Sequence, residues 1–369
     1  MATLSTPSRH ALFQQFFPPP KFLEMPAVGL DVSDAAVSAM ELVRRKRALA
    51  GGRFGRRALP RGSIAGGYVH DKDAVVEELR KLKDELGLDF VNASLSEENA
   101  YLFKTNIPRV GRKEIRSALE FKLEENVPIA ASDAIFDYSI ITQAGHESSD
   151  HLDVSVTVLP KKVVEVYTGL LDAAGLIPLS FEIEAQAISR AVIPQGNRDT
   201  HLIMNIGESK TGLFIVSDEV VHFTSTVGVG GVHLTEAIAR HLSVSTLEAE
   251  SIKREPTAIK RGENADLFLA LTKIIATLRD EVNKLSVYWG THKDSAGEVG
   301  KKIAKLVLCG RDAGLSGLAE YLAMFFDGPV EVGNIWCNIC SFEDYIPPLL
   351  FNESLDFAAA VGLALPKGH

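Results

Sequence analysis

Cysteine is scarce in this sequence, which has only three thiols among 369 residues: Cys309, Cys337 and Cys340. So few cysteines exclude a disulfide framework and are typical of a reducing compartment, which predicts a cytoplasmic location. Cys337 and Cys340 have the spacing of half a zinc site or of a redox pair, but no second pair and no nearby histidine completes either one. Cys309 is expected in the buried core.

Positive charge is also in short supply, because 39 Lys and Arg residues face 48 Asp and Glu residues and the formal net charge is -9. Phosphate-backbone binding needs a cationic face, so this balance argues against nucleic acid as a partner. The exception is a basic block that runs from Arg44 to Arg61. This basic block has two interpretations: it contacts an anionic membrane surface, or it is a solvated hairpin loop.

Long apolar runs are missing as well. The longest apolar helix candidate, residues 267–278, is shorter than a bilayer span and contains Lys273, so no membrane-crossing segment is expected. Residues 1–26 contain a Phe-Phe-Pro-Pro-Pro run, which breaks helices. They lack the cationic region followed by an apolar core that a signal peptide has. This start is therefore predicted to be a flexible tail rather than a signal peptide.

What the sequence does contain is a repeated pattern. Residues 27–43 alternate like two strands joined by a tight turn, a third strand is expected near 56–59, and an amphipathic helix follows over 73–86. From residue 200 the pattern returns, with strands over 201–206, 211–217 and 220–227 and a helix over 233–241. The repeat predicts a duplicated α/β lobe with a ligand site in the cleft between the two copies.

Between the two copies the order is helix, strand, strand, helix, strand, which predicts a compact α+β insert. The expected division is a first lobe over 27–104, an inserted subdomain over 105–190, a second lobe over 191–345 and a C-terminal helical segment over 346–369 that returns to the first lobe.

The first predicted turn carries Asp31, Ser33 and Asp34. Two hairpin turns that face each other across a cleft can present backbone N–H groups to a polyphosphate. A carboxylate beside them would hold Mg²⁺ through water, and Asp31 is the candidate. The alternative is that Asp31 merely begins a hairpin.

The second turn repeats this layout with an amide, Asn205, in place of the acid, which makes Asn205 the second candidate near the metal. Gly207 allows close approach of a ligand, and the hydroxyls of Ser209 and Thr211 flank Lys210. Lys210 either reaches a phosphate or is solvated.

Glycines mark two further strand-to-helix turns, where a ligand can approach the backbone. Gly228, Gly230 and Gly231 precede one helix, and Gly310 and Arg311 lie between a later strand and helix.

This order of hairpins, insert and glycine turns resembles the superfamily of actin, Hsp70 and the sugar kinases. Within it the chain resembles the PilM family, which is related to the cell-division protein FtsA. Three stretches are similar to PilM sequences: residues 112–128, residues 173–178 together with 182–187, and residues 361–364. The resemblance implies an α/β, actin-like (ribonuclease H-like) duplicated two-lobed fold with a small inserted α+β subdomain.

The resemblance also implies roles for single residues. Asp31 and Ser33 belong to the first phosphate loop, Gly207 and Thr211 to the second, and Gly310 to the adenosine loop. Two further sites complete this set: Glu250 and Lys253 on a helix contact the nucleoside, and Glu184 orients an attacking water or is a helix N-terminal acid.

Three departures from the family pattern bear on catalysis: Asn205 replaces an Asp, Ser33 replaces a Gly and Arg311 replaces a Gly. Loss of one carboxylate weakens Mg²⁺ binding during phosphoryl transfer. The expectation is ATP binding with Mg²⁺ and weak or absent hydrolysis, so that any enzyme activity is that of a degenerate ATPase.

The PilM-like function is a cytoplasmic scaffold of type IV pilus assembly, peripheral to the inner membrane. It docks the N-terminal peptide of a PilN-like membrane protein, with other platform proteins and the assembly motor as further partners. The alternatives are a small-molecule kinase of the same fold and an FtsA-like division protein. No sugar-binding motif supports the kinase, and the amphipathic tail expected of FtsA does not follow the last packed segment.

Overall fold

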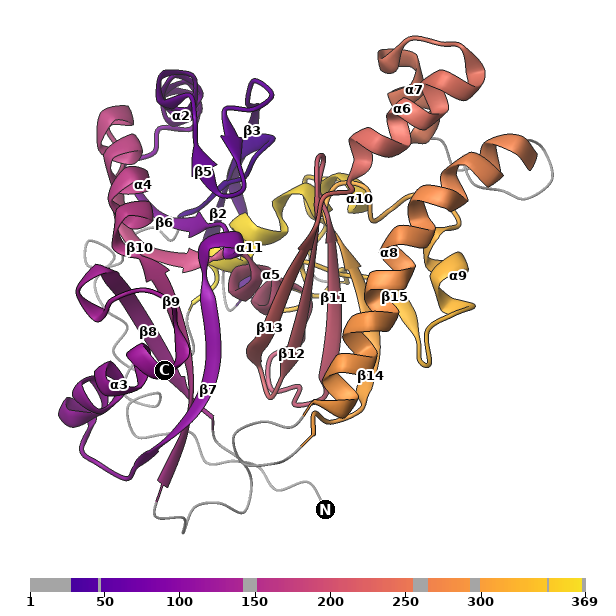
Figure 1. Cartoon of the computed structure of the whole chain (residues 1–369). Coiled ribbons are helices and arrows are strands. Elements are labelled where there is room, and N and C mark those ends of the chain that lie inside the picture. The colour runs from indigo at the N-terminus through magenta and orange to yellow at the C-terminus, as the bar shows by residue number, and fades with distance from the viewer. Residues whose placement is uncertain are drawn as a thin grey trace.

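The computed structural model describes residues 28–45, 48–141, 151–254, 265–292, 299–343 and 345–366. The predicted tail, Lys46 and Arg47 of the basic block, and the last three residues lie outside this part of the chain. Figure 1 shows two sheets side by side with helices between and around them, and a smaller sheet below the first.

Lobe 1 is built on a five-stranded sheet in the order β10-β6-β1-β2-β3. Strands β1 (Val28–Val32), β2 (Ala36–Arg45) and β3 (Ala48–Ala58) form an antiparallel meander, and β6 (Phe90–Leu95) and β10 (Ile177–Ile183) extend it in parallel. Helices α2 (Lys72–Leu86) and α4 (Lys161–Ala174) pack together on its outer side. As predicted, α2 buries the apolar face that contains Val75, Leu79 and Leu82.

Lobe 2 repeats this topology, with a sheet in the order β13-β12-β11-β14-β15. Strands β11 (Thr200–Ile206), β12 (Thr211–Ser217) and β13 (Val220–Val227) form the meander, and β14 (Ile303–Cys309) and β15 (Val330–Val332) add in parallel. Its helices are α6 (Gly231–Leu242), α7 (Thr246–Lys253), α8 (Ala265–Thr291) and α9 (Leu318–Ala323). The predicted duplication is confirmed, because both sheets share one strand order and one set of directions.

The insert has a sheet of its own, in the order β7-β9-β8. Its elements are β7 (Tyr101–Pro108), α3 (Arg112–Asn126), β8 (Ala134–Ile140) and β9 (His151–Pro160). Ile107, Leu119, Phe136 and Val156 form a core that is separate from the main one. Short elements complete the chain: β4 (Ile64–Ala65), β5 (Tyr68–Val69), η2 (Glu97–Asn99), η3 (Ala131–Asp133), α10 (Phe351–Ser354) and η4 (Leu355–Phe357).

Two expectations differ from the structure. Only part of the predicted insert over 105–190 lies in the separate sheet, because β10 pairs in parallel with β6 of lobe 1 and α4 packs on α2. The third strand begins at Ala48 rather than near Arg56, since the basic stretch pairs along β2. Three glycines within β3 hid its strand pattern.

Two arginines of the basic block form ion pairs within lobe 1. Arg53 forms a two-point ion pair with Glu41, with N···O distances of 2.8 and 2.9 Å, and Arg57 pairs with Glu85 at 2.6 Å. Arg44 and Arg45, at the end of β2, are exposed. None of the described helices is long and apolar enough to cross a bilayer. The predicted burial of Cys309 is confirmed.

Two helices between the sheets, α5 (Glu184–Val192) and α11 (Ala358–Ala364), pack closely against each other (Figure 1). A Cβ atom built on Gly29 of β1 would lie 1.8 Å from the carbonyl oxygen of Ala360, and one on Gly362 would lie 1.8 Å from that of Ala187. Only glycine allows backbone to meet backbone at these two points.

We predict that Gly362→Ala lowers the free energy of unfolding by about 1 to 3 kcal/mol or more, because the added methyl group forces α11 away from α5. Gly169→Ala is the matched control, since an added Cβ there on α4 meets nothing within 4 Å. It should raise stability by about 0.5 to 1 kcal/mol through helix propensity. Urea denaturation of both variants measures the difference, and equal effects would contradict the packing argument.

Candidate functional site

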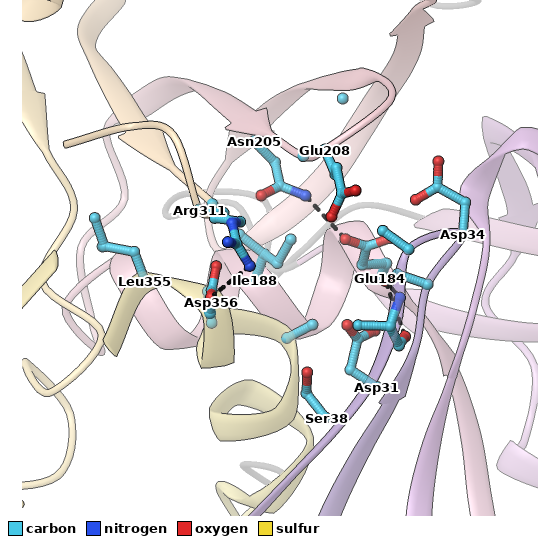
Figure 2. Close-up of a pocket in the computed structure, with 18 of the residues that line it drawn as sticks. Asp31, Asp34, Ser38, Glu184, Ile188, Asn205, Glu208, Arg311, Leu355 and Asp356 are labelled. Carbon is cyan, nitrogen blue, oxygen red and sulfur yellow. Dashed lines mark hydrogen bonds and ion pairs between the residues drawn. The ribbon is translucent and has the colours of Figure 1, made fainter. Parts of the chain in front are cut away.

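The candidate site is the cleft where the β1–β2 turn of lobe 1 faces the β11–β12 turn of lobe 2 (Figure 2). Its free volume is about 70 Å³. Ligand pockets usually measure roughly 300 Å³ or more, so these turns must separate to admit a nucleotide.

The first turn is organised by its own side chains. Ser33 Oγ donates to the carbonyl oxygen of Ala36 at 3.0 Å, and Asp31 Oδ1 accepts a hydrogen bond of 2.7 Å from Ser94 Oγ. Burial raises the pKa of Asp31 to about 6, which the hydrogen bond from Ser94 only partly offsets. Asp31 therefore points into the cleft as a carboxylate that favours a cation or a proton beside it.

The second turn is held by backbone hydrogen bonds. The N–H of Gly207 donates to the carbonyl oxygen of Lys210 at 2.9 Å, and the N–H of Gly231, at the start of α6, donates to that of Gly207 at 2.9 Å. Thr211 Oγ1 donates to the carbonyl oxygen of Val229 at 2.6 Å. The turn is thus docked on the N-terminus of α6, and its hydroxyl at Thr211 is already engaged.

Direct contacts close the cleft between the two turns. Ser209 Oγ donates to Asp34, and the Lys210 ammonium pairs with Glu98 of η2. Burial opposes the charge on Lys210, but Glu184 and the hydrogen bond to Glu98 outweigh it, so the pKa of Lys210 is raised. The ammonium is the main positive charge facing the acids of lobe 1.

Those acids lie close together, with Asp31 and Glu97 buried and Glu184 half-buried. Asn205 Nδ2 donates to Glu184 Oε1 at 2.8 Å, and burial followed by the charges of Glu97 and Asp31 raises the pKa of Glu184 well above its usual value (Figure 2). Glu97 Oε2 is buried without a hydrogen-bond partner. An excess of buried carboxylates favours a site that takes up positive charge together with any anionic ligand.

Two arginines that were not predicted as a pair line the outer part of the cleft. Arg56 of β3 and Arg311 each lie 3.8 Å from Asp356, and Arg56 lies 3.9 Å from Glu208. The sequence assigned Arg56 only to the basic block, and no pattern connects it with Asp356, which is 300 positions away.

Glu250 and Lys253, predicted to contact the nucleoside, form a cluster with Asp312 in which Lys253 and Asp312 are buried and Glu250 is half-buried. Lys253 Nζ lies 2.7 Å from Asp312 and 2.8 Å from Glu250, and Arg311 lies 3.5 Å from Glu250. Desolvation raises the pKa of Glu250, but hydrogen bonds from Lys253 and Thr235 prevail and lower it to about 2. The pair is a structural support for the Arg311 turn in this conformation.

The structure brings together most of the predicted site residues. Those that line the cleft are Asp31, Ser33, Asp34, Glu184, Asn205, Gly207, Lys210, Gly310 and Arg311. Those that do not line it are Ser209, Thr211, Gly228, Gly230, Gly231, Glu250 and Lys253. Gly310 has φ +86°, and a Cβ there would lie 2.5 Å from Asn205 Oδ1, so this position requires glycine.

Within the described ranges, no group of three or more His, Cys, Asp or Glu side chains is arranged to hold a metal ion. Asp31 is bonded to Ser94, and the Asn205 amide donates to Glu184. Asp31 and Asn205 cannot surround a Mg²⁺ ion by themselves. They fit an ion that is held mainly by water and by the phosphates of a ligand, which is how Mg²⁺ often binds.

Comparison with known proteins identifies similar chains. A family model described as "Type IV pilus assembly protein PilM" matches residues 29–367. Among solved structures, a "PilM-PilN type IV pilus biogenesis complex" matches with a TM-score of 0.74 and 21% identity, over 92% of this chain and 98% of that chain.

Two more distant structures share the fold. The ethanolamine utilization protein EutJ from Carboxydothermus hydrogenoformans matches with a TM-score of 0.54 and 16% identity, over 94% of this chain and 90% of that one. MreB 5 of Spiroplasma citri bound to AMPPNP matches with a TM-score of 0.51 and 14% identity, over 85% of this chain and 93% of that one. These likenesses confirm the predicted actin-like two-lobed fold.

We predict that Lys253→Met destabilises the protein by about 3 to 5 kcal/mol, because it leaves the buried carboxylate of Asp312 without its partner. Lys253 and Asp312 are only 3% and 5% exposed. The double variant Lys253→Met, Asp312→Asn removes both charges and should recover a large part of the loss. Thermal and urea unfolding measure both, and a double variant no more stable than the single one would contradict a buried ion pair.

Proposed function

Because this chain belongs to the PilM family of type IV pilus assembly proteins, we propose that it is an actin-like scaffold at the cytoplasmic side of the pilus machinery. In this proposal ATP binds between the lobes, and the N-terminal peptide of a PilN-like membrane protein binds beside the insert. The observation that carries the proposal is the pair of turns that face each other across a cleft lined by both lobes.

The chemistry of the cleft supports a nucleotide. Lys210, Arg56 and Arg311 supply positive charge for phosphates once the turns separate, and the Gly207 and Gly310 turns let a ligand approach the backbone. A bound Mg²⁺ would neutralise phosphate charge beside the buried acids. The similar MreB 5 structure carries AMPPNP, a nucleotide analogue, on the same fold.

The same residues argue for slow hydrolysis. A general base needs a free oxygen within hydrogen-bond reach of the water from which it takes a proton. In this structure Asn205 Nδ2 donates to Glu184 Oε1 at 2.8 Å, and a hydrogen bond to the carboxylate lowers its basicity. We therefore propose that Glu184 is a weak base at best and that the nucleotide acts mainly as a structural ligand.

We predict that the protein binds fluorescent mant-ATP in the presence of Mg²⁺ and releases phosphate slowly or not at all. Lys210→Gln should weaken binding about tenfold or more, since it removes the ammonium nearest the acid cluster. Lys161→Gln, on the exposed start of α4, is the matched control and should bind like the wild type. Rapid phosphate release in a colorimetric assay would contradict the proposed role of Asn205 and Glu184.

The proposed peptide site is a hollow of about 790 Å³ between the insert and the two lobes, which we call the insert groove. Tyr138 of β8 and Thr157 of β9 line it from the insert, Phe181 and Arg190 from lobe 1, and Val220 from lobe 2. Its volume falls within the usual range of ligand sites. Contributions from all three parts of the molecule make it a natural docking place for an extended segment.

The geometry of β8 suits an extended peptide. This strand is at the edge of the insert sheet and pairs with β9 alone in the described chain. An edge strand offers backbone donors and acceptors to an added strand, while pockets beside it select side chains. At the far wall Arg190 and Glu182 form a two-point ion pair, at 2.7 and 2.6 Å, that offers polar contacts.

We predict that a synthetic peptide of the PilN-like cytoplasmic N-terminus binds the wild type and that Ile135→Glu weakens this binding about tenfold or more. Ile135 on β8 is 39% exposed and lines the groove, so the charge would be buried beneath the peptide. Ile177→Glu, at 51% exposure on β10 and outside the groove, should bind normally. Isothermal titration measures both, and equal losses would refute this location.

Association with the inner membrane follows from the peptide in this proposal, because the partner is a membrane protein. The exposed Arg44 and Arg45 at the end of β2 add a local attraction to anionic headgroups. Other platform proteins and the assembly motor stay predictions, since no surface of the described chain singles them out.

A further inference from the structure

The residues that precede the first strand have a composition unlike the rest of the chain. Residues 1–27 contain four of the 18 phenylalanines and five of the 16 prolines, far more than an even distribution over 369 residues would place there. Most of them gather in residues 16–26, which read Phe-Phe-Pro-Pro-Pro-Lys-Phe-Leu-Glu-Met-Pro. We call this stretch the entry segment, because it leads into β1.

The composition of the entry segment suits a peptide that binds in a groove in an extended conformation. Proline fixes its own φ angle and favours an extended conformation in the residue before it. Such a segment loses less conformational entropy on binding than a chain without proline. Phe22, Leu23 and Met25 supply large apolar side chains, whose burial is favourable.

The strand that follows the entry segment begins beside the insert groove. A Cβ atom built on Gly29 of β1 would lie 2.8 Å from the backbone nitrogen of Ala364, the last residue of α11. The next two residues of the chain, Leu365 and Pro366, line the groove. The chain therefore enters β1 within a few residues of the groove wall.

The entry segment is also long enough for the groove. An extended chain spans about 3.3 Å per residue, so these residues span about 36 Å. The edge strand β8 has 7 residues, which corresponds to about 23 Å. The entry segment is thus longer than the strand that it would follow.

The lining of the groove offers matching surfaces. Phe136, Tyr138 and Phe181 line it with aromatic rings, against which proline and phenylalanine side chains pack. Ile135 of β8 adds an exposed aliphatic side chain at the same wall. β8 pairs with β9 alone in the described chain, so its outer edge can accept an extended segment.

The charges of the groove and of the chain before β1 are opposite in sign. Among the charged residues that line the groove, Arg190 and Glu182 pair with each other, which leaves the acids Asp137 and Glu219. Residues 1–27 have two basic side chains and one acidic side chain. Electrostatic attraction therefore favours this occupant.

We infer that the entry segment occupies the insert groove in the free protein and that the partner peptide must displace it. The displacement rests on the proposed function, whereas the occupancy does not. Because the segment is tethered to β1, its effective concentration at the groove is on the order of millimolar, so a weak intrinsic affinity is sufficient. An occupied groove also covers the edge of β8, which would otherwise be open to strands of other chains.

The occupancy is tested in the full chain with the photo-crosslinker p-benzoylphenylalanine in place of Phe22. Irradiation should join position 22 to a groove residue of the same chain, and mass spectrometry of the monomer locates the bond. Ile135→Glu places a charge in the groove and should reduce this cross-link about fivefold or more. Ile177→Glu, outside the groove, is the matched control and should leave it unchanged.

Three results of the cross-linking would overturn the inference. A bond between two chains would assign the groove to a second copy of the protein. A bond to residues outside the groove would place the entry segment elsewhere. Loss of the cross-link in Ile177→Glu as well as in Ile135→Glu would show that it does not report on the groove.

The displacement is tested by isothermal titration with the PilN-like N-terminal peptide. Leu23→Glu places a charge in the entry segment and should release it from the apolar lining, so the peptide should bind about fivefold or more tightly than to the wild type. Leu4→Glu adds the same charge before the entry segment and should bind the peptide like the wild type. Equal affinities in the wild type and Leu23→Glu would overturn the displacement.

The two experiments separate this inference from the proposed function. A peptide that binds neither the wild type nor Leu23→Glu would remove the proposed function and the displacement, while a cross-link confined to the groove would still establish the occupancy. A peptide that binds the wild type, together with no cross-link in the groove, would leave the proposed function standing and overturn the occupancy.

Discussion

The architecture depends on one constraint, the approach of helix backbone to strand and helix backbone at the centre of the molecule. At Gly29 and Gly362 the carbonyl oxygens of α11 and α5 occupy the space where any other residue would carry its Cβ. This contact sets the distance between α11, the sheet of lobe 1 and α5. Because Asp31 lies in β1 only two residues after Gly29, the same contact fixes where the acid enters the cleft.

The electrostatics of the cleft depend on the acids that this packing places there. Folding buries the carboxylates of Asp31 and Glu97 and half-buries that of Glu184 in one region, which is unfavourable unless positive charge accompanies them. The protein supplies part of this charge through Lys210 from the opposite lobe. Charge balance therefore holds the lobes together, and a ligand that brings its own cation competes with this contact. This competition supports the proposal that a nucleotide acts mainly as a structural ligand.

The sequence was sufficient for the repeat and for both turns, because hairpins and glycine turns are local features that leave a local pattern. Asp31, Lys210 and Gly310 converge as predicted for that reason. The contact between Arg56 and Asp356 was missed because it joins distant segments of the chain. The end of the insert was misplaced because the residues of β10 do not reveal that this strand pairs with β6 of lobe 1. The resemblance assigned Lys253 to the nucleoside contact, and in this structure its ammonium forms a buried ion pair with Asp312.

The position of α5 also explains why its polar contacts could not be predicted from the sequence. Its apolar pattern reads as an ordinary short core helix, and Glu184 at its start reads as a favourable helix N-terminal acid. Only the folded chain shows that its two polar sides face different cavities, with Asn205 on one side and Thr157 on the other. Glu184 and Gln186 are half-buried and line these two cavities, so filling the core does not account for their polar side chains. The hydrogen bonds at both sides are thus best understood as links between the lobes and the insert.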